Sequence, residues 1–199
     1  MQGQPMTMPT LEIELKFLLA RADIDALLGA LPAGETAVKA MTAIYYDTAD
    51  GFLGRSGFGL RVRRTGDKRI QTLKSALGDD GGRDEWEWPV ATDAAEPALL
   101  ADTPAALPDG AVLAPQFTVE VSRTVRIVET DGARIEIALD DGEVRAGGRR
   151  EAFLELELEL LSGPPQVLHR LAVRLGERVA LAPSTVTKAE RGFGLLRGT

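Results

Sequence analysis

Leu11-Glu12-Ile13-Glu14-Leu15-Lys16-Phe17 alternates apolar and charged residues at every step. Successive side chains of a β-strand point to opposite faces, so this stretch predicts a strand with one charged and one apolar face. Residues two apart on a strand lie about 6.5 to 7 Å from each other on the same face. Glu12, Glu14 and Lys16 therefore form a single charged row. Which of the two faces is buried decides the fold.

Seven further stretches have strand-like composition, and most are bounded by Gly, Asp or Pro clusters. We expect strands at 42–48, 57–65, 69–75, 83–91, 117–128, 132–140 and 152–161. Turn residues at 65–68 and 130–132 link consecutive strands, which predicts hairpins and an antiparallel sheet.

Two segments have the apolar spacing of amphipathic helices. The first is 22–31, which ends before Pro32, and the second follows Gly163-Pro164-Pro165 and ends near Gly176. The stretch 93–107 is rich in Ala, Pro and Asp, so we expect a surface connection with one short helix there.

The charged row of the first strand recurs on most of the others. The same-face sets are Arg61 and Arg63; Thr72 and Lys74; Arg83, Glu85 and Glu87; Arg134, Glu136 and Asp140; and Glu155, Glu157 and Glu159. In an ordinary half-buried sheet such rows face water. The alternative is a closed barrel whose charged rows line an interior channel while the apolar rows lie outside, under the helices. Both predicted helices have apolar stripes that need such a surface, which favours the barrel.

The predicted fold class is therefore mainly β (α+β): an eight-stranded closed antiparallel β-barrel with a few flanking helices. The 199 residues, 44% of them hydrophobic, suffice for one core. We expect a single domain over residues 10–199, preceded by a flexible leader at residues 1–9.

The charge balance restricts the partners. A net charge of -7 argues against a protein that coats nucleic acid or an anionic membrane, so an anionic ligand would need a local basic cluster. The absence of cysteine excludes thiolate metal sites, and a lone His169 excludes a multi-histidine site. No signal peptide or membrane-spanning stretch is apparent, and we expect a cytoplasmic protein.

Glutamates that converge inside a barrel need counter-ions. Two carboxylates about 4 Å apart repel by roughly 4 kcal/mol at an effective dielectric near 20. Oxygen-only ligands favour Mg²⁺ or Mn²⁺. Basic residues from separate strands could hold phosphate oxygens: Lys16, Arg61, Arg63, Lys74, Arg123 and Lys188. The sequence contains no Walker loop and no nucleophile triad. We therefore expect the barrel to catalyse phosphoryl transfer by positioning the substrate and by electrostatic stabilisation of the transferring phosphoryl group.

These residues also resemble a known family. Glu12-Ile13-Glu14-Leu15-Lys16 is similar to the ExExK signature of the CYTH proteins, also called triphosphate tunnel metalloenzymes. Further blocks that resemble the family lie at 44–48, 59–63, 72–74, 134–144 and 154–163. The resemblance is greatest to bacterial inorganic triphosphatases in which this domain precedes a helical CHAD domain, and 187–193 is similar to the end of their barrel. A CHAD domain is therefore an expected C-terminal partner, absent from this chain.

The resemblance implies roles for individual residues. The implied metal ligands are Glu12, Glu14, Asp140, Glu155 and Glu157, with two ions when substrate is bound. The implied phosphate ligands are Lys16, Arg61, Arg63, Lys74, Arg123 and Lys188. Glu12, Glu14, Lys16 and Glu157 would be catalytic, and Glu87 and Glu136 would complete an acidic wall. Val121 stands where some members place a second basic residue beside Arg123.

The function expected from these roles is hydrolysis of inorganic triphosphate to pyrophosphate and phosphate. The family also contains thiamine triphosphatases and adenylate cyclases that use the same tunnel, and both remain alternatives. A module that binds polyphosphate without catalysis is a third. The sequence leaves the physiological substrate, the preferred metal and the oligomeric state open.

Overall fold

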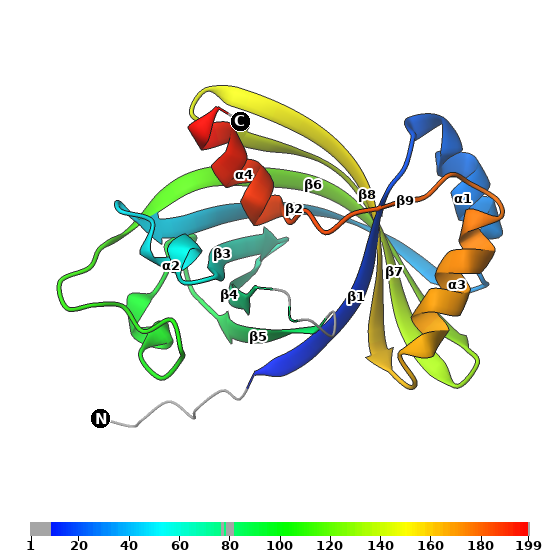
Figure 1. The fold of residues 1–199 in the computed structure, drawn as a ribbon, viewed down its shortest axis with the longest axis horizontal. Coiled ribbons are helices and arrows are strands. Elements are labelled where there is room, and N and C mark those ends of the chain that lie inside the picture. Colours follow the sequence, from blue (N-terminus) through cyan, green and yellow to red (C-terminus); the bar gives the residue numbers. More distant parts are fainter. Residues whose placement is uncertain (1–8, 77, 79–81, 199) are drawn as a thin grey trace.

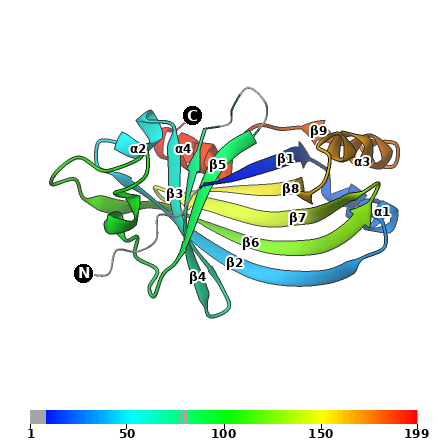
Figure 2. The ribbon, with the colours of Figure 1, turned by 90° about the horizontal axis from the view of Figure 1, so that it is seen from below.

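Eight antiparallel strands close into a barrel in the computed structural model, which describes residues 9–76, 78 and 82–198 (Figures 1 and 2). The strands are β1 (Thr10–Leu18), β2 (Glu35–Thr48), β3 (Phe58–Thr65), β4 (Lys68–Ser75), β5 (Gly82–Pro89), β6 (Leu113–Thr130), β7 (Ala133–Ala146) and β8 (Arg149–Ser162). Their order is β5-β4-β3-β2-β6-β7-β8-β1, and the pairing of β1 with β5 closes the barrel. The predicted fold class is confirmed. Apart from Pro9, the expected leader lies outside the described residues.

The strand β1 closes the barrel because it pairs with both β5 and β8. Its first half pairs with β5 and its second half with β8, while the two-residue strand β9 (Ala182–Pro183) adds to the end of β1. Glu12 lies directly opposite Arg83 on β5, and Lys16 lies opposite Glu157 on β8. Glu12, Glu14 and Lys16, which form the ExExK row, therefore lie at the seam of the barrel, where β1 joins β5 to β8.

Several strands are longer than the sequence predicts. The strand β2 begins at Glu35, seven residues before the expected start, because its first half pairs with β6. Residues 35–40 of this half are exposed and do not alternate in character, so the pattern that identifies a half-buried strand is missing there. The strands β6, β7 and β8 also extend beyond the predicted bounds.

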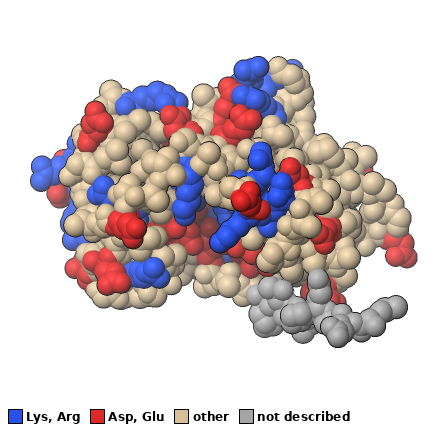
Figure 3. All heavy atoms as spheres, turned by 180° about the vertical axis from the view of Figure 1, so that it is seen from behind, with Lys and Arg blue, Asp and Glu red and all other residues tan. Residues whose placement is uncertain are grey.

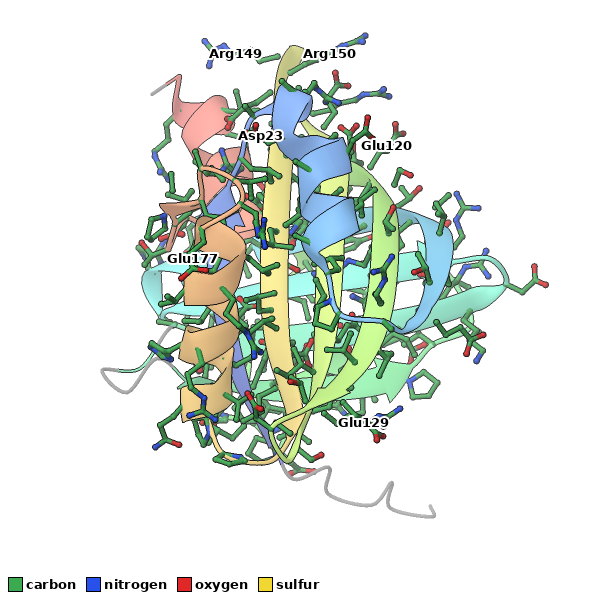
Figure 4. All side chains as sticks on the ribbon, turned by 90° about the vertical axis from the view of Figure 1, so that its right-hand side faces the viewer. Asp23, Glu120, Glu129, Arg149, Arg150 and Glu177 are labelled. Atoms are coloured by element: carbon green, nitrogen blue, oxygen red, sulfur yellow. The ribbon has the colours of Figure 1, made fainter. Side chains whose placement is uncertain are left out.

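Two helices cover the outer face of the sheet where they were expected. These are α1 (Ile24–Ala30), preceded by the short helix η1 (Arg21–Asp23), and α3 (Gln166–Gly176) (Figure 4). Their apolar residues, such as Leu27 and Leu171, pack with Ile137 of β7 and Leu156 of β8 in one buried cluster. This arrangement confirms that the apolar rows of these strands lie outside, under the helices.

The connection between β5 and β6 covers another part of the outer face. It contains the short helix η2 (Pro97–Leu100), and Leu100 packs with Trp86 of β5 and Leu60 of β3. The fully buried Gln71 fastens the connection, because its side chain donates to the carbonyl of Glu96 and accepts from the amide of the same residue. Between β2 and β3 lies α2 (Phe52–Arg55), a helix that was not predicted from the sequence.

The last helix, α4 (Lys188–Arg197), was also not predicted, and it corrects the expected interior. Its Phe193 packs edge-on against Phe117 of β6, with ring centroids 5.1 Å apart. Phe117 belongs to a buried apolar cluster with Val121 of β6 and Phe153 of β8. On β6, Phe117 and Val121 share their face with Arg123. The inward face of this strand therefore changes from apolar to charged along its length. The expectation that apolar rows lie only outside is wrong at this end of the barrel.

None of the helices in the described part of the chain is both long and apolar enough to cross a membrane.

Candidate active site

A cavity of about 720 Å³ occupies the barrel, and every strand from β1 to β8 and the helix α4 contribute to its lining. Eleven of the predicted site residues line it: Glu12, Glu14, Lys16, Arg61, Arg63, Lys74, Glu87, Arg123, Glu136, Glu157 and Lys188. Figure 3 shows basic and acidic side chains side by side in the middle of one face of the molecule. The charged rows therefore converge on one cavity.

At the seam of the barrel, two cations hold Glu12. Lys74 Nζ lies 2.7 Å from both carboxylate oxygens, and Arg83 Nε lies 2.7 Å from Oε2. Burial alone would raise the pKa of Glu12, but the charges of Lys74 and Arg83 outweigh it and lower the pKa to about 2. Arg83 also donates to Glu14, with Nη2 2.5 Å from Oε1. Arg83 was not among the site residues predicted from the sequence.

Three carboxylates meet near the start of α4. Lys188 Nζ lies 2.9 Å from Asp140, 3.1 Å from Glu155 and 2.8 Å from Glu157. Arg123 binds Asp140 through two parallel hydrogen bonds. Asp140 and Glu155 are fully buried and do not line the large cavity. The structure therefore does not bring these two predicted metal ligands together with Glu12 and Glu14.

Glu157 faces the cavity from the edge of this group. Burial would raise its pKa, but the charges of Lys188, Arg123 and Lys16 hold the pKa well below the ordinary value. Lys16 Nζ lies 3.6 Å from its Oε1. Glu157 is therefore an ionised carboxylate surrounded by cations.

Two arginines of β3 have fewer close partners than Glu157 has. Arg61 is partly buried and lines the cavity, and its buried Nε has no hydrogen-bond partner among the described residues. Arg63 has one distant partner, Glu87, at 3.6 Å. The charge of Arg61, together with burial, lowers the pKa of Arg63 to about 10. A buried donor without a partner, next to an arginine whose pKa is lowered, fits an anionic ligand.

Two carboxylates across the barrel from Arg61 and Arg63 have raised pKa values because they are buried and other carboxylates lie near them. Burial and the charges of Glu12 and Glu136 raise the pKa of Glu159 to about 7. Burial and Glu157 likewise raise the pKa of Glu14. Glu159 was not among the predicted site residues, although it follows Glu155 and Glu157 on the same face of β8. That spacing was sufficient to find it.

The matched family model describes a CYTH domain and covers residues 10–193. The chain belongs to the CYTH domain family. A relative from Haemophilus influenzae, named inorganic triphosphatase, is 30% identical over 156 residues, which are 75% of this chain and 44% of the relative. The chain thus spans less than half the length of this curated CYTH relative.

Solved structures share the CYTH barrel at lower identity. The Hippeastrum protein HpAC1, named as a candidate adenylyl cyclase and described as having a dominant triphosphatase activity, matches with a TM-score of 0.63 at 21% identity over 96% of each chain. A Bacillus halodurans protein named as a candidate adenylate cyclase matches with a TM-score of 0.62 at 20% identity, over 93% of this chain and 98% of that one. These similarities establish the fold.

The donor chemistry of this CYTH barrel fits a hard divalent cation. Carboxylate oxygens are the ligands that Mg²⁺ and Mn²⁺ prefer, and a cation would relieve the repulsion around Glu14 and Glu159. Within the described residues, however, no three acidic or histidine side chains already converge in the geometry of a metal site. Basic side chains, including Arg83, Lys74 and Lys188, occupy much of the carboxylate oxygen surface instead.

Proposed function

We propose that this CYTH domain hydrolyses inorganic triphosphate to pyrophosphate and phosphate with the help of a divalent metal ion. One observation carries the proposal: a single cavity contains arginines suited to an anion and carboxylates suited to a cation. Arg61 Nε has no hydrogen-bond partner among the described residues and the pKa of Arg63 is lowered, while the pKa values of Glu14 and Glu159 are raised. A metal complex of an extended polyphosphate carries both complementary charges. A simple anion would satisfy the arginines and increase the repulsion at the carboxylates.

The basic residues bind the phosphate chain in this proposal. Arg61 and Arg63 hold one end through guanidinium hydrogen bonds, and Arg61 Nε gains the partner it lacks. The remaining phosphate oxygens are bound by Lys16, Lys74, Arg123 and Lys188. Their positive charge offsets the charge that spreads over the equatorial oxygens of the transferring phosphoryl group.

The acidic residues bind the metal. Glu12, Glu14, Glu157 and Glu159 line the cavity and are the candidate ligands, with Glu87 and Glu136 beside them. A bound Mg²⁺ or Mn²⁺ supplies polarisation of phosphate oxygens and activation of water. Asp140 and Glu155 were expected to be ligands as well. We assign them a positioning role instead, because they hold Lys188, and Asp140 also holds Arg123.

A second candidate substrate class has one observation in its favour. Phe58 and Phe193 line the cavity near α4, and aromatic rings could contact the organic part of a nucleoside or thiamine triphosphate. The positions of the phosphate ligands would be the same. The choice is therefore a matter of substrate specificity within one tunnel.

Phosphate release from triphosphate, pyrophosphate, ATP and thiamine triphosphate, each with Mg²⁺, Mn²⁺ or EDTA, tests the proposal. Rapid, metal-dependent release from triphosphate and slow release from the others is the expected result. Faster release from an organic triphosphate would assign the tunnel to that substrate. Tight binding of triphosphate without turnover under any of these conditions would make the domain a polyphosphate-binding module and would refute the proposal.

The expected location is the cytoplasm. The cysteine-free sequence fits a reducing compartment, and the fractionation of the native protein tests this assignment.

A further inference from the structure

Arg83 bridges the two acidic residues of the ExExK row. Its Nε lies 2.7 Å from Glu12 Oε2, and its Nη2 lies 2.5 Å from Glu14 Oε1. The Arg83 side chain is 9% exposed, so this contact is largely shielded from water. One guanidinium thus occupies one oxygen on each of two proposed metal ligands, Glu12 and Glu14.

The backbone fixes this arrangement. Arg83 and Glu12 are directly opposite each other in the β1–β5 pair, and both side chains point into the cavity. Arg83 differs in this respect from Arg61, whose Nε has no partner among the described residues. Arg61 is thus available to an anion, whereas Arg83 neutralises carboxylates.

A divalent cation and the Arg83 guanidinium would compete for the same oxygens. A carboxylate oxygen that accepts a short hydrogen bond from a cation offers less negative potential to a second cation. The phosphates of a bound substrate offer the Arg83 guanidinium another anion to bind. Once Arg83 binds the phosphates, the carboxylate oxygens are free to bind the metal.

We infer that Arg83 is an internal counter-ion that holds Glu12 and Glu14 until a metal–phosphate complex enters, and that it then transfers to the phosphates. This inference rests on the proposed function. It makes metal and phosphate binding cooperative: metal alone binds weakly, and each ligand strengthens the binding of the other by the same factor. The enzyme would then hold metal mainly together with substrate.

A purely structural role is the alternative, since four residue pairs of the described chain form the β1–β5 pair and Arg83 links its two strands. In that case, removal of Arg83 would lower stability and would not strengthen metal binding. The affinity for metal in the absence of substrate therefore separates the two roles.

The experiment measures Mn²⁺ binding by titration calorimetry and by electron paramagnetic resonance of free Mn²⁺, with and without saturating pyrophosphate. The proteins are the wild type, Arg83→Gln, and the control Arg145→Gln, which removes the same charge from an exposed ion pair. Arg83→Gln should bind Mn²⁺ alone at least tenfold more tightly, which corresponds to about 1.4 kcal/mol. The enhancement by pyrophosphate should shrink by a similar factor. Arg145→Gln should match the wild type.

Unchanged or weaker Mn²⁺ binding by a folded Arg83→Gln protein would overturn the inference. If that variant does not fold, Arg83→Lys decides the question: it keeps a charge at the seam but cannot span both carboxylates, so an affinity equal to that of the wild type would overturn the inference too. Glu14→Gln separates this failure from that of the proposed function. Equal Mn²⁺ affinity in the wild type and Glu14→Gln would mean that the metal site itself is elsewhere.

Discussion

Lys188, the first residue of α4, donates a 2.8 Å hydrogen bond to Glu157 of β8 inside the barrel. The same ammonium group contacts Asp140 and Glu155, and all three carboxylates are buried. The Lys188 side chain therefore fastens α4 to strands β7 and β8 inside the barrel. Its loss would leave three buried negative charges with fewer counter-ions.

The Lys188→Met variant tests this anchor. Removal of one partner from a buried ion-pair network typically destabilises a protein by about 3 to 5 kcal/mol. We expect a loss of this size in the free energy of unfolding, measured by urea denaturation at pH 7. Arg145→Met is the matched control, because its exposed pair contributes at most about 1 kcal/mol. Similar losses in both variants would argue against the anchor.

The helix α4 illustrates what could and could not be predicted from the sequence. Two glycines and a short apolar stripe make 188–197 a poor helix by propensity, and its stability depends on packing inside the barrel. One local signal was present. Thr187 and Glu190 form a capping box, in which the Thr187 hydroxyl accepts from the Glu190 amide at 3.0 Å.

The site was largely predictable because strand alternation assigns each side chain to a face. Glu12, Glu14 and Glu157 follow that rule, and so does Glu159, which was placed in a charged row but given no role in the site. The partners across the barrel were not predictable, because β1 meets β5 only when the barrel closes. The contact between Glu12 and Arg83 therefore required the three-dimensional structure.

Gly192 provides a test of how α4 fits the barrel. A Cβ added at this position would overlap the ring of Phe117, whereas one added at Gly29 in α1 would meet nothing within 4 Å. Gly29→Ala should raise stability by up to about 1 kcal/mol, because alanine is the better helix former. Gly192→Ala should lower it by about 1 to 3 kcal/mol, because the helix must shift. Thermal unfolding of both variants measures the difference, and equal stabilisation would contradict the close packing of α4.

Glu159 should make stability depend on pH. Its folded-state pKa of about 7 exceeds the ordinary value of 4.5, so the native protein retains a proton that the unfolded chain releases between these pH values. Its contribution to stability therefore falls as the pH rises from 4.5 to 7. Glu159→Gln should stabilise the metal-free protein by about 1 to 2 kcal/mol at pH 8, after allowance for screening, and by little at pH 4.5.

Urea denaturation at the two pH values measures this effect. Glu129 is exposed near the end of β6, and Glu129→Gln is the control that removes an exposed charge (Figure 4). Destabilisation by Glu159→Gln at pH 8, or the same effect at both pH values, would show that the repulsion from Glu12 and Glu136 is not significant.

Arg61 should be essential for binding the phosphate chain. A hydrogen bond to a charged group contributes about 1.5 to 3 kcal/mol, so Arg61→Ala should lower kcat/KM for triphosphate by at least tenfold. Arg61→Lys should recover only part of the loss, because an ammonium group lacks the planar fork. Steady-state phosphate release measures both, with the exposed Arg150→Ala as control (Figure 4). Full activity in Arg61→Lys would mean that charge alone suffices.

The most direct test of the tunnel as a metal-dependent active site is phosphate release from triphosphate with Mn²⁺ by the wild type and by Glu14→Gln, with circular dichroism to check folding. Rapid release by the wild type, and a loss of at least a hundredfold in a folded Glu14→Gln protein, is the predicted result, since that change removes a charge but little volume. Equal rates in the two proteins, or no release by the wild type, would contradict the account.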